Sequence, residues 1–278
     1  MSLLRKTLKT ANIGLQNSII YKKNFLLSFL TGVFGLFVQL VFWPAFYNAG
    51  TDFSFAAIDK TVIAGYYLNE MMTYSLLVYF IQRGTAMMNI GGSIKDDIMS
   101  GGLNIQLIRP TKYLWTKWIS SISGQIINLV LSLAVFISVL LCFRFTFIIP
   151  TSYRQILFTV IFIIFASVLS FLINGILGLL SFWLLETNAI NQIVGMATAI
   201  LAGTLFPIDF IQGTLGSILK LLPFCYLAYI PTQIYLGKVE TSQLMDNTLI
   251  CVFWIIMLTL IMDRLWRSGM RRYSAFGG

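Results

Sequence analysis

The stretch QILFTVIFIIFASVLSFLINGILGLLSFWLL, residues 155–185, contains no Asp, Glu, Lys or Arg. The hydrocarbon core of a bilayer is about 30 Å thick, and a helix that advances about 1.5 Å per residue crosses it in roughly 20 apolar residues. Backbone polar groups must be paired in lipid, so a stretch of this kind is expected to form a membrane-spanning helix. The sequence therefore predicts that this chain lies in a bilayer.

Five other stretches share this apolar character. They are residues 24–51, 61–82, 118–143, 187–208 and 247–262, of which the second is interrupted by Glu70 and the last is slightly short. The pattern predicts an all-α membrane protein with six transmembrane helices. With 278 residues, 58% of them hydrophobic and 10% charged, the chain leaves no room for a separate soluble domain of the usual ~100 residues or more. We expect one membrane domain over residues 1–278.

The positive charges predict the orientation, because short loops rich in Lys and Arg stay in the cytoplasm. Most of the 19 Lys and Arg residues fall on one set of alternating connections: Arg5, Lys6, Lys9, Lys22, Lys23, Arg83, Lys95, Arg109, Lys112, Lys117, Arg264, Arg267, Arg271 and Arg272. The other side carries Lys60, Arg144, Arg154, Lys220 and Lys238. Both termini are therefore expected to be cytoplasmic. Topology also accounts for the net charge of +9, so we expect no nucleic-acid partner.

The composition argues against an enzyme. The chain has no histidine, and Cys142, Cys225 and Cys251 are widely spaced without a C-x-x-C pair. Asp96 and Asp97 are adjacent, so on a helix they point about 100° apart and make a poor catalytic pair. We expect no catalytic, cofactor-binding or metal site. The glycine-rich segments at 91–95 and 101–102 do not fit the nucleotide-binding pattern G-x-x-x-x-G-K-[ST], so any ATP hydrolysis would need another subunit.

The amino-terminal residues 1–23 are predicted to form an amphipathic helix on the inner membrane surface. Apolar residues recur there every three or four positions: Leu4, Leu8, Ala11, Leu15 and Ile19. An ordinary basic topology signal without a mechanical role is the alternative.

Residues 83–117 form the most polar internal connection, where a cytoplasmic partner is expected to bind. Ile94, Ile98 and Met99 are spaced as one face of a short helix, and Lys95, Asp96 and Asp97 are expected on its solvent side. The helix should end at the glycine pair 101–102, and Arg109 and Pro110 should redirect the chain. A passive solvated loop is the alternative.

Residues 207–243 form a long but largely apolar connection. Pro223 and Pro231 divide it into pieces too short to cross a bilayer, which favours a re-entrant hairpin at the outer surface. Backbone of this kind is tolerated at membrane depth only beside protein or a water-filled cavity. We expect an outer gate, a segment that closes the exit, with Phe206 and Pro207 at its start. An interfacial loop without a gating function is the alternative.

Glu70 is the one ionisable residue expected well inside a span. A carboxylate at that depth costs on the order of 2.5–3.5 kcal/mol, so it should pair, be protonated or face the bundle interior. Asn69 and Tyr74 are expected to lie near it, on a translocation path or at a protomer interface. A satisfied polar packing residue is the alternative.

Together these features resemble the permease subunit of a type-2 ABC exporter, in the six-helix group related to drug and antibiotic exporters. Four segments carry the resemblance in order: the basic amphipathic start; GGLNIQLIRP, residues 101–110; GTLFPIDF and LLPFCYLAYIPTQIYLGK, residues 203–210 and 221–238; and RSGMRRYSAFGG, residues 267–278.

The resemblance implies a bacterial plasma (inner) membrane transporter with two permease protomers, identical or homologous, and two ABC ATPase subunits that bind ATP and Mg. It implies a short coupling helix in the first inner loop, here residues 92–110, with Ile94, Lys95, Asp96, Asp97, Ile98 and Arg109 contacting the ATPase. It also implies a substrate path between protomers, lined mainly by the first, second and fifth helices.

Other classes of protein fit the sequence less well. An ion-coupled secondary carrier would show repeated halves and several buried polar groups, and a lipid-modifying enzyme would show a cluster of His, Asp, Glu or Cys. A non-transporting assembly factor is a further alternative. An apolar cleft with one acidic group would suit a lipophilic or cationic compound, including a drug, peptide or lipid.

Overall fold

The computed structural model describes residues 22–47, 62–85, 88–108, 112–142, 147–184 and 187–273. This part of the chain is helical and contains no strand, as expected. The predicted amphipathic helix lies almost entirely outside the described residues, since only 22 and 23 are included, and Arg109 lies outside them as well.

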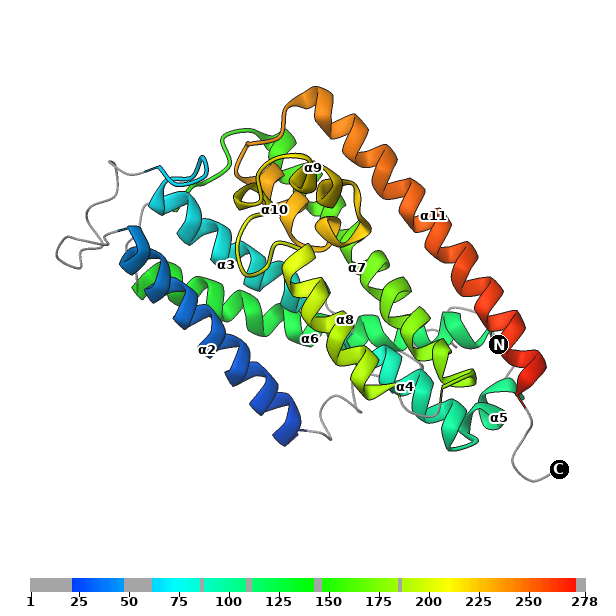
Figure 1. Cartoon of the computed structure of the whole chain (residues 1–278). Helices are drawn as coiled ribbons and strands as arrows, with labels where there is room; N and C mark the ends of the chain where they lie inside the picture. Colours follow the sequence, from blue (N-terminus) through cyan, green and yellow to red (C-terminus); the bar gives the residue numbers. More distant parts are fainter. Residues whose placement is uncertain are drawn as a thin grey trace.

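Four helices are long and apolar enough to cross a membrane. They are α2 (Lys22–Tyr47), α6 (Tyr113–Cys142), α7 (Tyr153–Leu179) and α11 (Thr241–Arg272). They correspond to four of the six predicted spans. In Figure 1, α7 and α11 run side by side, and α2 lies on the opposite side of the bundle.

Helices also occur at the other two predicted spans, but they are shorter. The helix α3 (Leu68–Thr85) begins after a tight turn in which Ala64 and Gly65 have positive φ, so the expected start at residue 61 is wrong. The helix α8 (Asn188–Leu201) ends before Gly203, whose φ of +70° leaves the right-handed helical region. Length and apolarity therefore confirm four spans, and the six-helix topology stays a prediction.

The short helices gather at the two ends of the bundle (Figure 1). At one end, here the α4–α5 end, lie α4 (Met88–Met99) and α5 (Gly102–Leu107). At the other, the α9–α10 end, lie η2 (Ile208–Phe210), α9 (Thr214–Leu221), η3 (Pro223–Leu227) and α10 (Tyr229–Tyr235). A further short turn, η1 (Leu180–Phe182), follows α7. Each of these pieces is shorter than a membrane crossing requires.

The central helix is α7, which contacts α3, α4, α10 and α11. Its contact with α4 depends on glycine: a Cβ added at Gly178 would lie 2.7 Å from the carbonyl oxygen of Gly91. Beyond this contact, Tyr113 stacks on Trp266 with ring centroids 5.0 Å apart, which joins the first turn of α6 to α11. The α4–α5 end is thus packed against both α7 and α11.

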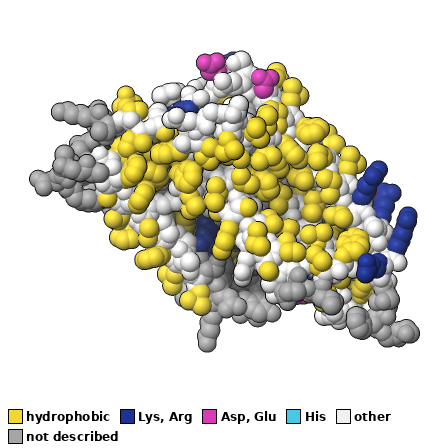
Figure 2. Space-filling model, viewed as in Figure 1, with side chains coloured by type: hydrophobic (Ala, Val, Ile, Leu, Met, Phe, Trp, Pro, Cys, Tyr) yellow, Lys and Arg dark blue, Asp and Glu magenta, His cyan; other side chains and the backbone are white. Residues whose placement is uncertain are grey.

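The surface of the bundle is suited to lipid. Figure 2 shows hydrophobic side chains over most of the visible face, acidic ones where α11 begins and basic ones where it ends. Phe34 on α2, Ile164 on α7 and Leu260 on α11 each expose more than half of their surface. Soluble monomers rarely expose apolar patches beyond a few hundred Å². The distribution supports a multi-pass membrane protein.

Candidate functional site

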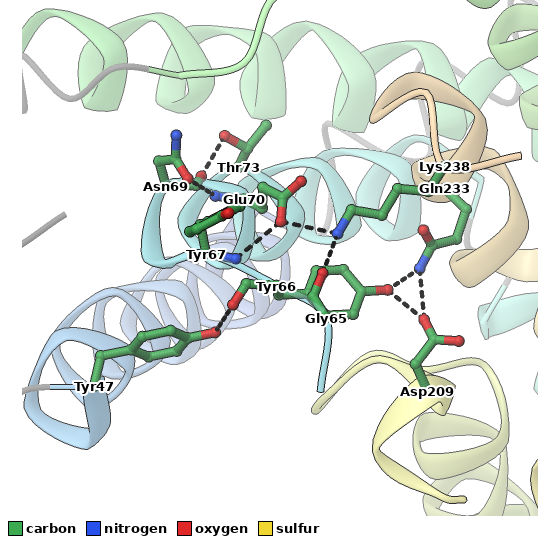
Figure 3. A network of polar contacts seen from close by, with 10 residues as sticks. All are labelled: Tyr47, Gly65, Tyr66, Tyr67, Asn69, Glu70, Thr73, Asp209, Gln233 and Lys238. Carbon is green, nitrogen blue, oxygen red and sulfur yellow. Dashed lines mark hydrogen bonds and ion pairs between the residues drawn. The ribbon is translucent and has the colours of Figure 1, made fainter. Parts of the chain in front are cut away.

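The carboxylate of Asp209 is the centre of a polar network at the α9–α10 end, and Figure 3 shows its contacts with Tyr66 and Gln233. Its Oδ1 accepts hydrogen bonds from Lys220 Nζ and from the Tyr229 hydroxyl, both at 2.7 Å. Its Oδ2 accepts from the Tyr66 hydroxyl and, at 3.1 Å, from Gln233 Nε2. Since a carboxylate has about four acceptor sites, these donors satisfy it completely.

The donors also determine the charge of Asp209. Burial by itself would raise the pKa of this carboxyl, but the hydrogen bonds from Lys220, Tyr66 and Tyr229 outweigh burial and lower the pKa below its ordinary value. The pKa of Tyr66 and that of Tyr229 are both raised. Burial is the largest cause, and the neighbouring Asp209 carboxylate adds to it. The network therefore consists of an ionised acid surrounded by neutral tyrosines and one lysine.

Tyr66 connects this network to α2. Its backbone oxygen accepts a 2.8 Å hydrogen bond from the Tyr47 hydroxyl at the end of α2, while its own hydroxyl donates to Asp209. Nearby, the Tyr74 hydroxyl on α3 donates to the backbone oxygen of Gly203, and Gln39 Nε2 on α2 donates to that of Thr204 at 3.0 Å. The α9–α10 segment is thereby attached to α2 and to the start of α3.

Glu70 lies in the first turn of α3, so the expectation that it sits deep inside a span is wrong. Its Oε2 forms a 2.8 Å ion pair with Lys238 Nζ and accepts the backbone N–H of Tyr67 at 2.9 Å. The same Lys238 donates to the backbone oxygen of Gly65 (Figure 3). Of the two expected neighbours, Asn69 does lie beside Glu70, since its side chain accepts the backbone N–H of Glu70. The Tyr74 hydroxyl instead donates to the backbone oxygen of Gly203. The carboxylate is paired, which leaves no free acidic group here.

The residues predicted for the outer gate lie around this network. Phe206 packs on Phe210, with centroids 6.2 Å apart, and Pro207 is buried immediately before η2. Pro223 begins η3, whereas Pro231 lies inside the first turn of α10 and does not break the chain there. The connection consists of short helices, as predicted, but of the two prolines only Pro223 marks the start of one. Its depth in the membrane stays a prediction.

At the α4–α5 end the structure separates the residues predicted to bind an ATPase. Ile94 and Ile98 are buried in this chain's own core, whereas Met99 is exposed. The helix does end at the predicted glycines, because Gly101 has a φ of +76°. The two isoleucines therefore anchor α4 and are not available to a partner.

The charged residues of α4 also differ from expectation. Asp97 is not on the solvent side: its Oδ2 pairs with Lys117 Nζ at 2.8 Å and accepts the Tyr113 hydroxyl at 2.9 Å. Lys95 Nζ reaches Asn188 Oδ1 at 2.9 Å, which links α4 to the start of α8. Asp96 alone of the three is exposed, as predicted.

Sequence reasoning predicts no helix at α5, which carries an exposed apolar surface. Leu103 is fully buried and holds α5 against the core. Beyond it, Ile105, Leu107 and Ile108 expose 64%, 42% and 85% of their surface, and we call these three residues the α5 tip. The only signal in the sequence is the apolar alternation within NIQLI, which is too short to indicate a helix by itself.

The long apolar helices, the lipid-suited surface and the two polar ends define a multi-pass helical membrane protein. A family model described as ABC-2 family transporter protein matches residues 33–277, so the chain belongs to this family. No curated protein matches the chain. The family comprises ABC-2 type permease subunits, which are membrane transport components without catalytic activity of their own and which associate with ABC ATPases.

Proposed function

We propose that this chain is the membrane-spanning permease of an ATP-driven exporter in the bacterial plasma membrane. It works with a second permease protomer, identical or homologous, and with two separate ATPase subunits that bind ATP and Mg. Its substrate is a lipophilic or cationic compound, such as a drug, peptide or lipid. Family membership and the lipid-suited surface support this assignment.

In this proposal the chain crosses the membrane six times, with both termini in the cytoplasm. Besides the four long helices, α3 and α8 supply the other crossings. The 18 residues of α3 extend about 27 Å, which is close to the thickness of the hydrocarbon core. The basic residues near the α4–α5 end, including Lys112 and Lys117 on one side and Arg271 on the other, support a cytoplasmic position for that end.

The observation that carries the proposal is the exposed α5 tip. The helices α4 and α5, with 12 and 6 residues, are too short to cross a membrane, so an apolar tip on them is suited to contact with another protein. Because α4 packs backbone to backbone against α7, a displacement of the tip would be passed to the membrane-spanning bundle. We place the ATPase contact at Ile105, Leu107 and Ile108.

Affinity purification of the tagged chain from native membranes tests this function. We expect an ATPase subunit to copurify with the wild type and to be lost in Ile105→Glu, because a charge at the tip would be buried without a partner. Ile105→Leu should retain the ATPase. Ser217→Glu, which adds the same charge to the exposed surface of α9, should retain it as well.

Two results would contradict the proposal. Purification without any ATPase, combined with transport driven by an ion gradient in vesicles, would make the chain a secondary carrier. Retention of the ATPase by Ile105→Glu would place the contact elsewhere on the chain.

A further inference from the structure

A cavity of about 940 Å³ lies between α3, α4, α7 and α8. This volume is at the upper end of the range of small-molecule sites in proteins, roughly 300–1,000 Å³. All the residues that line it belong to one chain. Its lining includes Ser170 and Asn174 of α7 and Asn191 and Thr198 of α8.

The helix α8 has two different faces. Asn191, Gly195 and Thr198 border the cavity, whereas Ile193 and Met196 point away from it and expose 68% and 71% of their surface. The helix contains no buried residue, so this chain's own core does not explain the polar face. Polar groups are disfavoured toward lipid, which indicates that the polar face borders a hydrated space or a bound molecule.

Two glycines border the cavity. Gly92 on α4 and Gly195 on α8 both lie within helices and have no positive φ. A Cβ added at either position would meet no heavy atom within 4 Å, unlike one at Gly178, where the facing backbone is too close. Glycine weakens a helix relative to alanine. Neither backbone conformation nor close packing within this chain explains these two glycines.

The cavity also has an acidic character. Asp96 borders it and is exposed, and its carboxylate pairs with no cation among the residues that the structure describes. The neighbouring Asp97 is neutralised by Lys117, and Lys95 is directed to Asn188. Within the described part of the lining, Asp96 is therefore the acid whose carboxylate has no ion-pair partner. Ile173, Leu177 and Val194 add an apolar part to the wall.

We propose that this cavity binds an amphiphilic cation. The charged group of the ligand lies against Asp96, and its apolar part lies against Ile173, Leu177 and Val194. The space over Gly92 and Gly195 accommodates the body of the molecule. This proposal adds a substrate class and a binding site to the proposed transport function. Its physiological meaning rests on that function.

Equilibrium dialysis of rhodamine 6G, a monovalent amphiphilic cation, against the purified chain without ATPase tests the site. Gly195→Leu adds a large side chain at a position that borders the cavity and where a Cβ meets no neighbour, and we expect at least a tenfold increase in Kd. Ala197→Leu, on the exposed opposite face of the same helix, should leave Kd unchanged. Asp96→Asn should also raise Kd about tenfold, whereas Asp263→Asn, which removes an exposed acid of α11, should not.

Thermal unfolding of each variant separates an effect on binding from an effect on folding. Wild-type affinity in a folded Gly195→Leu or Asp96→Asn variant would overturn the proposal, as would the absence of dye binding by the wild type. An equal loss of dye affinity in the control variants Ala197→Leu and Asp263→Asn would overturn the proposal too. These outcomes are independent of ATPase copurification, so the site and the transport function fail separately.

Discussion

At the scale of single residues, Asp209 in η2 joins α9 and α10, which follow it closely in sequence, to the distant turn before α3. Its donors come from the turn before α3, from α9 and from α10, and Tyr66 is 143 positions away along the chain. Hydrogen bonds to charged groups contribute about 1.5–3 kcal/mol each, and an unpaired partner at such a site is costly. The network is therefore expected to determine how firmly the α9–α10 segment is held.

We predict that Asp209→Asn destabilises the protein by about 2 kcal/mol, because Lys220 loses its counter-ion and the new amide faces other donors. The melting temperature in detergent should fall by roughly 5 °C. Asp246→Asn, which changes an exposed acid near the start of α11, should have no effect and serves as the control. Equal melting temperatures for both variants would show that the network contributes no stability.

The same carboxyl predicts a dependence on pH. The pKa of Asp209 in the folded protein is lower than its ordinary value of 3.8, so its charge stabilises the fold above that pH. This contribution is lost as the pH falls through the folded pKa. The difference in melting temperature between the wild type and Asp209→Asn should be largest at neutral pH and should narrow below pH 3.8. A constant difference across this range would contradict the assignment.

The sequence alone identifies little of this network. Asp209 and Lys220 are an acid and a base 11 positions apart in a largely apolar connection, and they are the one signal of their ion pair. Glu70 attracts attention because it interrupts an apolar run, but its partner Lys238 is 168 positions away. Periodicity reports local structure, so contacts across such separations require the folded chain.

At the scale of elements, the contact between α4 and α7 is made by glycine backbone. A Cβ at Gly91 would lie 2.8 Å from the carbonyl oxygen of Asn174, and one at Gly178 would lie 2.9 Å from Ile94 Cβ. Neither neighbour is the end of a flexible side chain, so the two helices would have to separate. This close approach makes α4 a rigid extension of α7.

We predict that Gly178→Ala destabilises the protein by about 1–3 kcal/mol, the usual cost of overpacking. Gly92→Ala provides a matched control one position from the contact: its Cβ meets open space, so stability should be unchanged or should rise by about 0.5–1 kcal/mol. Thermal unfolding of the two variants in parallel measures both effects. Unchanged thermal stability in Gly178→Ala would mean that α4 is not closely packed against α7.

Apolar length locates the long helices but not their ends. The α11 helix extends well beyond the predicted residues 247–262, because its terminal turns are polar and do not contribute to an apolar pattern. In α3, the positive φ of Ala64 and Gly65 moves the start to Leu68, and only the glycine signals a turn in the sequence. The six residues of α5 are too few to predict a helix from sequence. The burial of Leu103 against the core explains why the helix forms.

At the scale of the whole molecule, the two ends differ in charge and in the kind of structure they carry. The end of α11 is basic, with Arg271 and Arg272 in its last turn, and lies near α5 (Figure 1). The α9–α10 end instead holds short helices and the Asp209 network. The positive-inside rule predicts a cytoplasmic position for the basic end.

This orientation is tested by cysteine labelling in right-side-out vesicles, after Cys142, Cys225 and Cys251 are replaced by alanine. We expect a membrane-impermeant maleimide to label Gln212→Cys in sealed vesicles, because this exposed position precedes α9. Ser268→Cys, which is exposed in the last turns of α11, should be labelled only after the vesicles are opened. The reverse pattern would contradict the proposed topology.

The helix α8 contributes no buried side chain to its own chain. The stability of the rest of the bundle is therefore expected to depend little on the residues that α8 carries, since most costly substitutions are those that disturb a packed core. Substitutions on the face of α8 that borders the cavity are therefore expected to alter the shape and polarity of the cavity at little cost in folding free energy.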